Sequence, residues 1–280
     1  MSAVVEVETD SPRVPRWKIT PRQWVFVVLV LLGVAFVFWT YEALNFAPSS
    51  SRWPTFWPYD PNPPAHPLQQ PYDPITDPAP LNSTANPGLT HTFVLRSWLD
   101  AKIPFVPLLA IPYLSFLALT PIILVLNLWM SSFRRFLTAG LALIVSQLVL
   151  DVGYLLFQTE VLRDTAAQEV VAQGGFGGTL VKMVWGNDAP FNGYPSGHVT
   201  WTTIGILGLW RLRKVIPKTA WILMAWMALV YPATVMLRQH YLMDVYAGLF
   251  VGFSCYWACM FLVERPRLVP KVDPHPWPGT

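Results

Sequence analysis

Residues 241–263 read YLMDVYAGLFVGFSCYWACMFLV, and this stretch decides the fold class. Asp244 is the only charged residue in it. An apolar stretch of about 18 residues or more is long enough, as a helix, to cross the hydrocarbon core of a bilayer. We therefore predict a transmembrane helix from Tyr241 to Val263, with Asp244 near its start.

Five further apolar stretches predict membrane helices elsewhere in the chain. They are Trp24 to Phe46, Pro104 to Met130, Phe136 to Phe157, a span that starts near Ser196 and includes Val199 to Trp210, and Ala220 to Leu237. The first is too long for the core of a cleaved signal peptide, so we expect it to be retained. The predicted fold class is an all-α, polytopic membrane helix bundle with about six transmembrane helices.

The composition of the 280 residues agrees with this prediction. Hydrophobic residues make up 53% and charged residues 12%, whereas soluble domains are about 45–50% apolar and about 25% charged. So little charge cannot cover a soluble surface, which excludes a soluble enzyme. A net charge of +3 without a basic run argues against a nucleic-acid partner. Cys255 and Cys259 are expected to be small buried side chains.

The lysines and arginines predict which ends of the helices face the cytoplasm. Arg52, Arg96, Lys102, Arg163, Lys182 and Arg238 fall in one set of connecting segments, and the other 13 of the 19 fall in the opposite set and the tails. Basic residues concentrate in cytoplasmic loops. We therefore place both termini in the cytoplasm and expect an integral protein of a bacterial-type inner or plasma membrane.

This topology divides the chain into five parts. Residues 1–23 form a cytoplasmic tail, 24–46 the first membrane helix, 47–103 a proline-rich outer loop, 104–263 a five-helix membrane core, and 264–280 a second cytoplasmic tail. Proline-rich sequence favours extended, irregular chain in the outer loop. A second outer segment, 158–195, is predicted to hold one short helix followed by a flexible glycine-rich stretch from Gln173 to Gly178.

The tetrapeptide Pro195-Ser196-Gly197-His198 has the features of a helix start that can bind an anion. Serine caps a helix N-terminus, and glycine allows a ligand to approach the backbone. The free N–H groups of the first turn favour phosphate. His198 could exchange a proton with a group bound there. Taken alone, the same four residues also suit an ordinary helix start.

His240 and Asp244 stand four residues apart, a spacing that places both on one face of a helix. The carboxylate can accept the hydrogen on the imidazole Nδ1 and leave Nε2 as a nucleophile. Ionisable residues inside membrane helices are costly and usually functional. The alternative is an interfacial histidine with a partnered aspartate. The predicted topology puts His240 and His198 on the same, outer side.

These residues resemble the type-2 phosphatidic acid phosphatase superfamily of membrane lipid phosphatases and phosphotransferases. That pattern has a basic first segment, then PSGH, then an arginine ahead of HxxxD. Here PSGH is complete at 195–198 and HxxxD is complete at 240–244. The resemblance spans about residues 98–263.

Two departures from the family pattern point to one branch of it. The phosphatases usually carry Ser-Arg shortly before the nucleophilic histidine, where this chain has Ala233-Thr234, and Arg163 is followed by Asp164 instead of proline. The branch containing inositol phosphorylceramide synthase is more similar. The similar segments are Leu99 to Pro107, Thr159 to Arg163, Asp188 to Asn192, and His240-Tyr241 with Asp244. That branch usually has leucine where this chain has Gly197.

The resemblance implies a mechanism. His240 would attack phosphorus, Asp244 would orient it, and His198 would act as acid and base. The candidate phosphate-binding residues are Arg163, Ser196, Gly197 and Arg238. The expected substrate is a lipid phosphate or phospholipid, with water or an alcohol as acceptor. No cofactor or metal is expected, since no carboxylate cluster suggests a magnesium site.

Other polar residues are weaker candidates. Asp100, Asp188, Asn192 and Lys182 could bind a polar headgroup, although loop turns and helix caps also use aspartate, and Lys182 also fits a solvated loop. Asp151 could support the site from the third span or bond to a neighbouring helix.

A non-catalytic transporter or scaffold is the competing hypothesis. A transporter more often has internal repeats and interrupted helices at the bilayer midplane. Here the polar groups gather at one face, which favours an enzyme.

Overall fold

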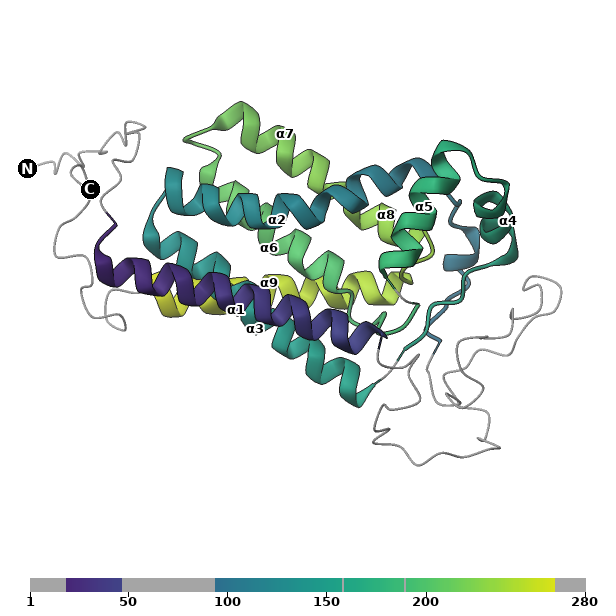
Figure 1. Cartoon of the computed structure of the whole chain (residues 1–280), viewed down its shortest axis with the longest axis horizontal. Helices are drawn as coiled ribbons and strands as arrows, with labels where there is room; N and C mark the ends of the chain where they lie inside the picture. Colours follow the sequence, from purple (N-terminus) through teal and green to yellow (C-terminus); the bar gives the residue numbers. More distant parts are fainter. Residues whose placement is uncertain (1–18, 47–93, 158, 189, 265–280) are drawn as a thin grey trace, which may run out of the picture.

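The structure is a computed structural model that describes residues 19–46, 94–157, 159–188 and 190–264. Both terminal tails (apart from Ile19 to Gln23 and Glu264) and most of the proline-rich loop predicted at 47–103 lie outside these ranges. Every regular element in the described ranges is a helix (Figure 1). The helices are α1 (Pro21–Phe46), η2 (Asp100–Lys102), η3 (Pro107–Leu109), α2 (Ala110–Met130), α3 (Phe133–Leu156), α4 (Thr165–Gln173), α5 (Gly175–Asn187), α6 (Gly197–Leu212), α7 (Pro217–Ala228), α8 (Val230–Met236) and α9 (Leu242–Glu264).

Within the described residues, five helical segments are long and apolar enough to cross a membrane. They are Pro21–Leu44, Pro107–Met130, Phe133–Leu156, Pro217–Met236 and Leu242–Glu264. The sequence predicts a sixth span at α6, but this helix has 16 residues. At about 1.5 Å per residue it is shorter than the roughly 30 Å hydrocarbon core. The all-α membrane bundle is confirmed, whereas the count of six and the sides of the termini stay predictions.

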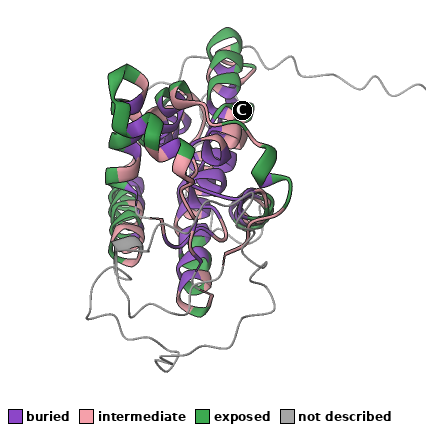
Figure 2. Ribbon diagram, turned by 90° about the vertical axis from the view of Figure 1, so that its right-hand side faces the viewer, coloured by how far each residue is buried: buried purple, intermediate pink, exposed green. Residues whose placement is uncertain are grey.

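Helix α6 forms the centre of the bundle. All residues from Gly197 to Gly205 are buried, and α2, α3, α7 and α9 pack around the helix. Helix α1 lies against α3 on the outside of the bundle, and most of its apolar side chains are exposed (Figure 1). Buried residues run through the interior of the bundle, and exposed residues lie on its outer faces (Figure 2). Apolar exposure on the outer helices and burial at α6 are what a lipid-facing bundle requires.

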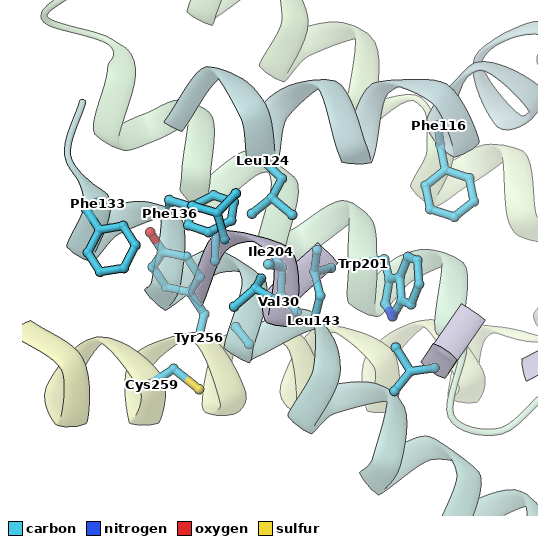
Figure 3. Packing of buried hydrophobic residues seen from close by; sticks show 14 of the residues in the cluster. Val30, Phe116, Leu124, Phe133, Phe136, Leu143, Trp201, Ile204, Tyr256 and Cys259 are labelled. Carbon is cyan, nitrogen blue, oxygen red and sulfur yellow. The ribbon is translucent and has the colours of Figure 1, made fainter. Parts of the chain in front are cut away.

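A core of apolar side chains joins the helices that hold the site. Phe136 and Leu143 of α3, Ile204 of α6 and Tyr256 of α9 meet in it, together with residues of α1, α2 and α8 (Figure 3). Helices α6 and α9 can approach closely because glycines of α9 face α6. A Cβ at Gly248 of α9 would lie 2.6 Å from the Ser196 carbonyl oxygen. The α6–α9 spacing therefore depends on this glycine.

The glycine-rich stretch predicted to be flexible is instead a tight turn followed by a helix. Gly174 and Gly175 have φ angles of +78° and +72°, and α5 starts at Gly175. A Cβ at Gly177 would lie 2.9 Å from the Pro107 side chain, and one at Gly178 would lie 3.0 Å from the Val170 carbonyl oxygen. The prediction was wrong because these glycines allow close packing of α5 on its neighbours.

Candidate active site

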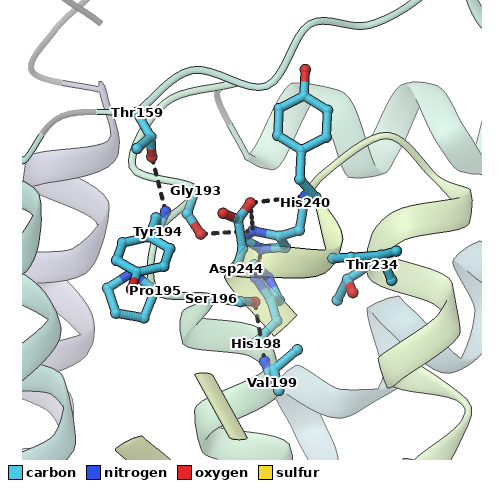
Figure 4. A network of polar contacts seen from close by, with 12 residues as sticks. Thr159, Gly193, Tyr194, Pro195, Ser196, His198, Val199, Thr234, His240 and Asp244 are labelled. Atoms are coloured by element: carbon cyan, nitrogen blue, oxygen red, sulfur yellow. Dashed lines mark hydrogen bonds and ion pairs between the residues drawn. The ribbon is translucent and has the colours of Figure 1, made fainter. Parts of the chain in front are cut away.

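The candidate site lies where several helices end on the same side of the bundle. Tyr41 is near the end of α1, Tyr113 is near the start of α2, and Tyr154 is near the end of α3. The first residues of α6 and α9 lie among them. Figure 4 shows how His198 of α6, His240 of the turn before α9 and Asp244 of α9 converge.

The sequence prediction that Pro195-Ser196-Gly197-His198 starts a helix is confirmed. Helix α6 begins at Gly197, and the Ser196 hydroxyl accepts a hydrogen bond from the Val199 N–H at 3.3 Å. Ser196 is fully buried, and its own N–H donates to the Asp244 carbonyl at 3.1 Å. Local capping therefore sets the position of His198 relative to α9.

His240 lies in the turn before α9 and not within the helix. The N–H groups of Gln239 and His240 both donate to the Thr234 carbonyl, and Arg238 adopts a φ of +58°. The spacing of four residues predicted a shared helix face, but α9 begins only at Leu242. The turn nevertheless brings His240 Nδ1 to 3.5 Å from Asp244 Oδ2.

The Gly193 carbonyl determines which nitrogen of His240 carries a hydrogen. Its oxygen lies 3.0 Å from His240 Nδ1, and a carbonyl can only accept. In the neutral ring Nδ1 therefore carries the hydrogen, and Nε2 carries the lone pair, which faces His198 Nδ1. The chain around Gly193 is held by Thr159, whose carbonyl accepts from Asn192 N–H at 2.9 Å and whose hydroxyl accepts from Tyr194 N–H at 2.9 Å.

Asp244 is a buried carboxylate, 1% exposed. Its Oδ2 accepts the Tyr241 N–H at 2.8 Å, while Oδ1 has no hydrogen-bond partner among the residues that the structure describes. A Cβ on Gly193 would lie 3.1 Å from Oδ2. Asp244 can thus stabilise positive charge on the His240 ring, as the sequence suggested.

His198 faces His240 with one nitrogen and a carboxylate with the other. Its Nδ1 is 3.4 Å from His240 Nε2, and its Nε2 is 3.6 Å from Asp188 Oδ2. The Tyr113 ring stacks on the imidazole with centroids 4.5 Å apart, and Phe116 lies at 5.0 Å. The packing fixes the orientation of the ring.

Asp188 ends α5 and is bound by two tyrosines. Tyr41 Oη donates to Oδ1 at 2.7 Å, and Tyr113 Oη donates to Oδ2 at 2.8 Å. Burial alone would raise the pKa of Asp188, but the two neighbouring histidines and the two tyrosine hydroxyls outweigh it and hold that pKa below its usual value. Asp188 is therefore a stable anion beside His198.

Arg163 is hydrogen-bonded to the backbone of Asp188. Its NH2 group donates to the Asp188 carbonyl at 2.7 Å, and the guanidinium stacks over Trp185 at 4.8 Å. Within the described ranges, its buried Nε has no hydrogen-bond partner. Burial lowers the pKa of Arg163 to about 10, against the opposing charge of Asp188. Arg163 therefore remains cationic at neutral pH, with a donor available to an anion.

Arg238 borders a polar cleft next to His240. Its Nε donates to Asp164 Oδ2 at 2.5 Å and its NH2 group to the Ile103 carbonyl at 2.9 Å. The cleft is small and partly open to solvent, and it is lined by Arg96, Asp100, Ile103, Leu162, Asp164, Val235, Arg238, His240 and Tyr241.

The other residues predicted for the site are Asp100, Asn192, Gly197 and Lys182. Asp100 accepts from the Leu242 N–H at 2.8 Å and so anchors the start of α9. Asn192 donates to the Leu44 carbonyl. Gly197 packs against Tyr154 and Tyr41. Lys182 is exposed on α5.

Asp151 joins two helices instead of reaching the histidines. Its carboxylate accepts from Thr40 of α1 at 2.7 Å and from Gln147 of α3 at 2.7 Å. Of the two interpretations raised from the sequence, the bond to a neighbouring helix is the one seen.

Three contributors were missed at the sequence level. Nothing local marks Tyr41 or Tyr113, which are far from Asp188 in the chain. Gly193 has a weak signal, since it stands two residues before Pro195. In the described part of the chain, no group of three or more histidine, cysteine, aspartate or glutamate side chains could hold a metal ion.

The chain around this site matches a known family. The model described as PAP2 superfamily matches residues 83–258, more than half of the chain. The chain belongs to the PAP2 superfamily. The match includes both histidines and Asp244, and it confirms the superfamily resemblance without indicating a branch. No curated protein and no solved structure gives a significant match. A PAP2 domain in a membrane-helix bundle fits a membrane phosphatase or phosphotransferase acting on a lipid phosphate.

Proposed function

We propose that the protein transfers the phosphoryl group of a lipid phosphate or phospholipid at the outer membrane face through a phosphohistidine on His240. One observation carries this proposal. The Gly193 carbonyl and Asp244 both contact Nδ1 of His240, which leaves Nε2 as a nucleophile next to His198 Nδ1. Imidazole activated in this way can attack phosphorus directly.

The neighbouring groups suit the rest of the reaction. Asp244 offsets the positive charge that forms on His240, and His198 protonates the leaving oxygen and then activates the acceptor. Arg163 has a buried donor that no described residue accepts from. The proposed ligands for the phosphate oxygens are Arg163, Arg238, Ser196 and the Gly197 N–H. An imidazole nucleophile requires no metal-bound water, so we expect EDTA to leave the activity unchanged.

The similarity of Leu99 to Pro107 and Asp188 to Asn192 to the inositol phosphorylceramide synthase branch favours a phosphotransferase over a simple phosphatase. The acceptor would then be a polyhydroxylated alcohol such as inositol or glycerol. The positive-inside bias supports an outward-facing site in a bacterial-type membrane.

The test uses purified protein in detergent with a panel of phospholipids and polyprenyl phosphates. Phosphate release without alcohol indicates hydrolysis, and a new phosphoester with added inositol or glycerol indicates transfer. Vanadate, which mimics pentacoordinate phosphorus, should inhibit. If no phosphoryl substrate in the panel is turned over, a transporter or scaffold becomes the better hypothesis.

A further inference from the structure

We propose that Asp188 is a positioning residue for His198, an inference that rests on the proposed function. In this arrangement the Asp188 carboxylate holds the Nε2–H of His198. Nδ1 is then the nitrogen that exchanges a proton with the substrate. Asp188 touches neither the phosphate nor the leaving group, and it acts only through the imidazole.

The geometry separates the two nitrogens of His198 clearly. Nδ1 faces His240 Nε2 at 3.4 Å, and Nε2 faces Asp188 Oδ2 at 3.6 Å. The second distance is that of an ion pair and exceeds a hydrogen bond. In the imidazolium form, each N–H of His198 therefore points to a group that can accept or attract it.

Asp188 is held in place independently of His198. Two tyrosine hydroxyls, from α1 and α2, donate one to each carboxylate oxygen. The Tyr113 ring also stacks on the imidazole, so one side chain aligns both the carboxylate and the ring. Ser196, and not Asp188, caps the start of α6. The two tyrosines thus hold the Asp188 carboxylate beside Nε2 of His198.

His198, the leaving group and the acceptor account for every proton that moves in the two steps of the reaction. In the first step, His240 Nε2 forms the N–P bond, the P–O bond to the leaving group breaks, and the leaving oxygen takes the proton of His198 Nδ1. In the second step, water or an alcohol forms a P–O bond, the N–P bond breaks, and the acceptor proton returns to Nδ1. Asp188 keeps its negative charge throughout.

Asp188→Asn tests the proposal. An amide can donate to Nε2 and so favour the wrong tautomer of His198. We expect kcat to fall about 100-fold or more with KM little changed, as for loss of a well-placed acid–base group. The backbone carbonyl that binds Arg163 is unaffected by this substitution. Asp188→Glu should restore part of the activity.

A substrate with a better leaving group separates positioning from a purely structural role. The nitrophenyl ester of the same lipid phosphate needs no proton on its leaving oxygen. Asp188→Asn should form phosphohistidine from this ester at near the normal rate and then accumulate it, because the second step still needs a base. Equal losses of the phosphorylation rate with both substrates would overturn the proposal.

The pH profile provides a second readout. In the described part of the chain, the titratable groups that contact His198 are Asp188, His240, Tyr41 and Tyr113. Burial lowers the pKa of His198, and the negative charge of Asp188 opposes this effect and favours the imidazolium. Removing it should therefore move the alkaline limb of kcat to lower pH. An unmoved limb in an active Asp188→Asn protein would count against the proposal.

Asp151→Asn is a matched control, because Asp151 is also a buried carboxylate with two side-chain donors. It should keep the kcat and pH profile of the unsubstituted protein. If Asp188→Asn does not fold, Tyr113→Phe keeps the carboxylate but removes one donor, and should show the same leaving-group dependence to a smaller degree. Without that dependence the proposal fails. Full activity of Asp188→Asn with an inactive His240→Ala refutes this inference alone, whereas an active His240→Ala refutes the proposed function.

Discussion

Helices α6 and α9 run side by side, and the charged or titratable side chains at their two ends differ sharply in exposure. At one end, His198, His240 and Asp244 are all at most 6% exposed. At the other, Arg211 and Glu264 form an ion pair at 2.6 Å with side chains 23% exposed. Partly solvated charges can pair at little cost, whereas buried charges must have specific partners. The same two helices therefore carry a reactive end and a merely structural end.

Between these two ends, the backbones of α6 and α9 pack closely against each other. Positions 248 and 252 have no space for a Cβ, which would meet the backbone oxygens of Ser196 and Thr200 at 2.6 and 2.8 Å. Thr200 donates to the Ser196 and Gly248 carbonyls. Close backbone packing thus sets the separation between His198 and the start of α9. Substitutions along the interface can therefore test whether activity depends only on the end that holds the two histidines.

Asp244→Asn should have the largest effect. It removes the charge beside His240 Nδ1 and replaces an acceptor with a potential donor. We expect kcat/KM to fall about 1,000-fold or more while the thermal unfolding midpoint changes little. A kinetic assay with the best lipid phosphate measures the first quantity, and an unfolding curve in detergent measures the second. Retention of most activity would show that this carboxylate is only structural.

Gly248→Ala should affect both activity and stability. The new methyl group would press on the Ser196 carbonyl, at the residue that caps α6. Overpacking of this kind costs about 1–3 kcal/mol, and the shift of α6 should also lower kcat. Gly186→Ala is the control, because position 186 in α5 has open space around it. That control should leave activity unchanged. Equal behaviour of the two variants would argue against a fixed α6–α9 separation.

Glu264→Gln should have the smallest effect. The pair with Arg211 is partly exposed, and such pairs contribute about 0–1 kcal/mol. We expect a small drop in the unfolding midpoint and unchanged kcat. A large loss of activity here would break the contrast between the two ends and would require coupling along the helices.

The sequence was sufficient for features that are local or periodic. Apolar stretches predicted the membrane helices, and Pro195-Ser196-Gly197 predicted the start and cap of α6. It was insufficient where the outcome depends on tertiary contacts. Tyr41 and Tyr113 reach Asp188 across 147 and 75 residues. Arg238 reaches Asp164 across 74 residues. No local pattern encodes these contacts.

One local prediction failed for a packing reason. The glycines after Gln173 indicated flexibility, but they form a turn and a closely packed helix. The membrane span predicted at α6 stays a prediction, because this central helix has 16 residues and is surrounded by its neighbours.

Detection of phosphate on His240 is the most direct test of the central claim. The protein is mixed with a labelled lipid phosphate, quenched in alkali within one turnover, and digested for mass spectrometry. The account predicts acid-labile phosphate on the His240 imidazole, greater accumulation in His198→Ala with a nitrophenyl ester substrate, and none in His240→Ala. An active protein with no label, or with its label on another residue, would contradict the account.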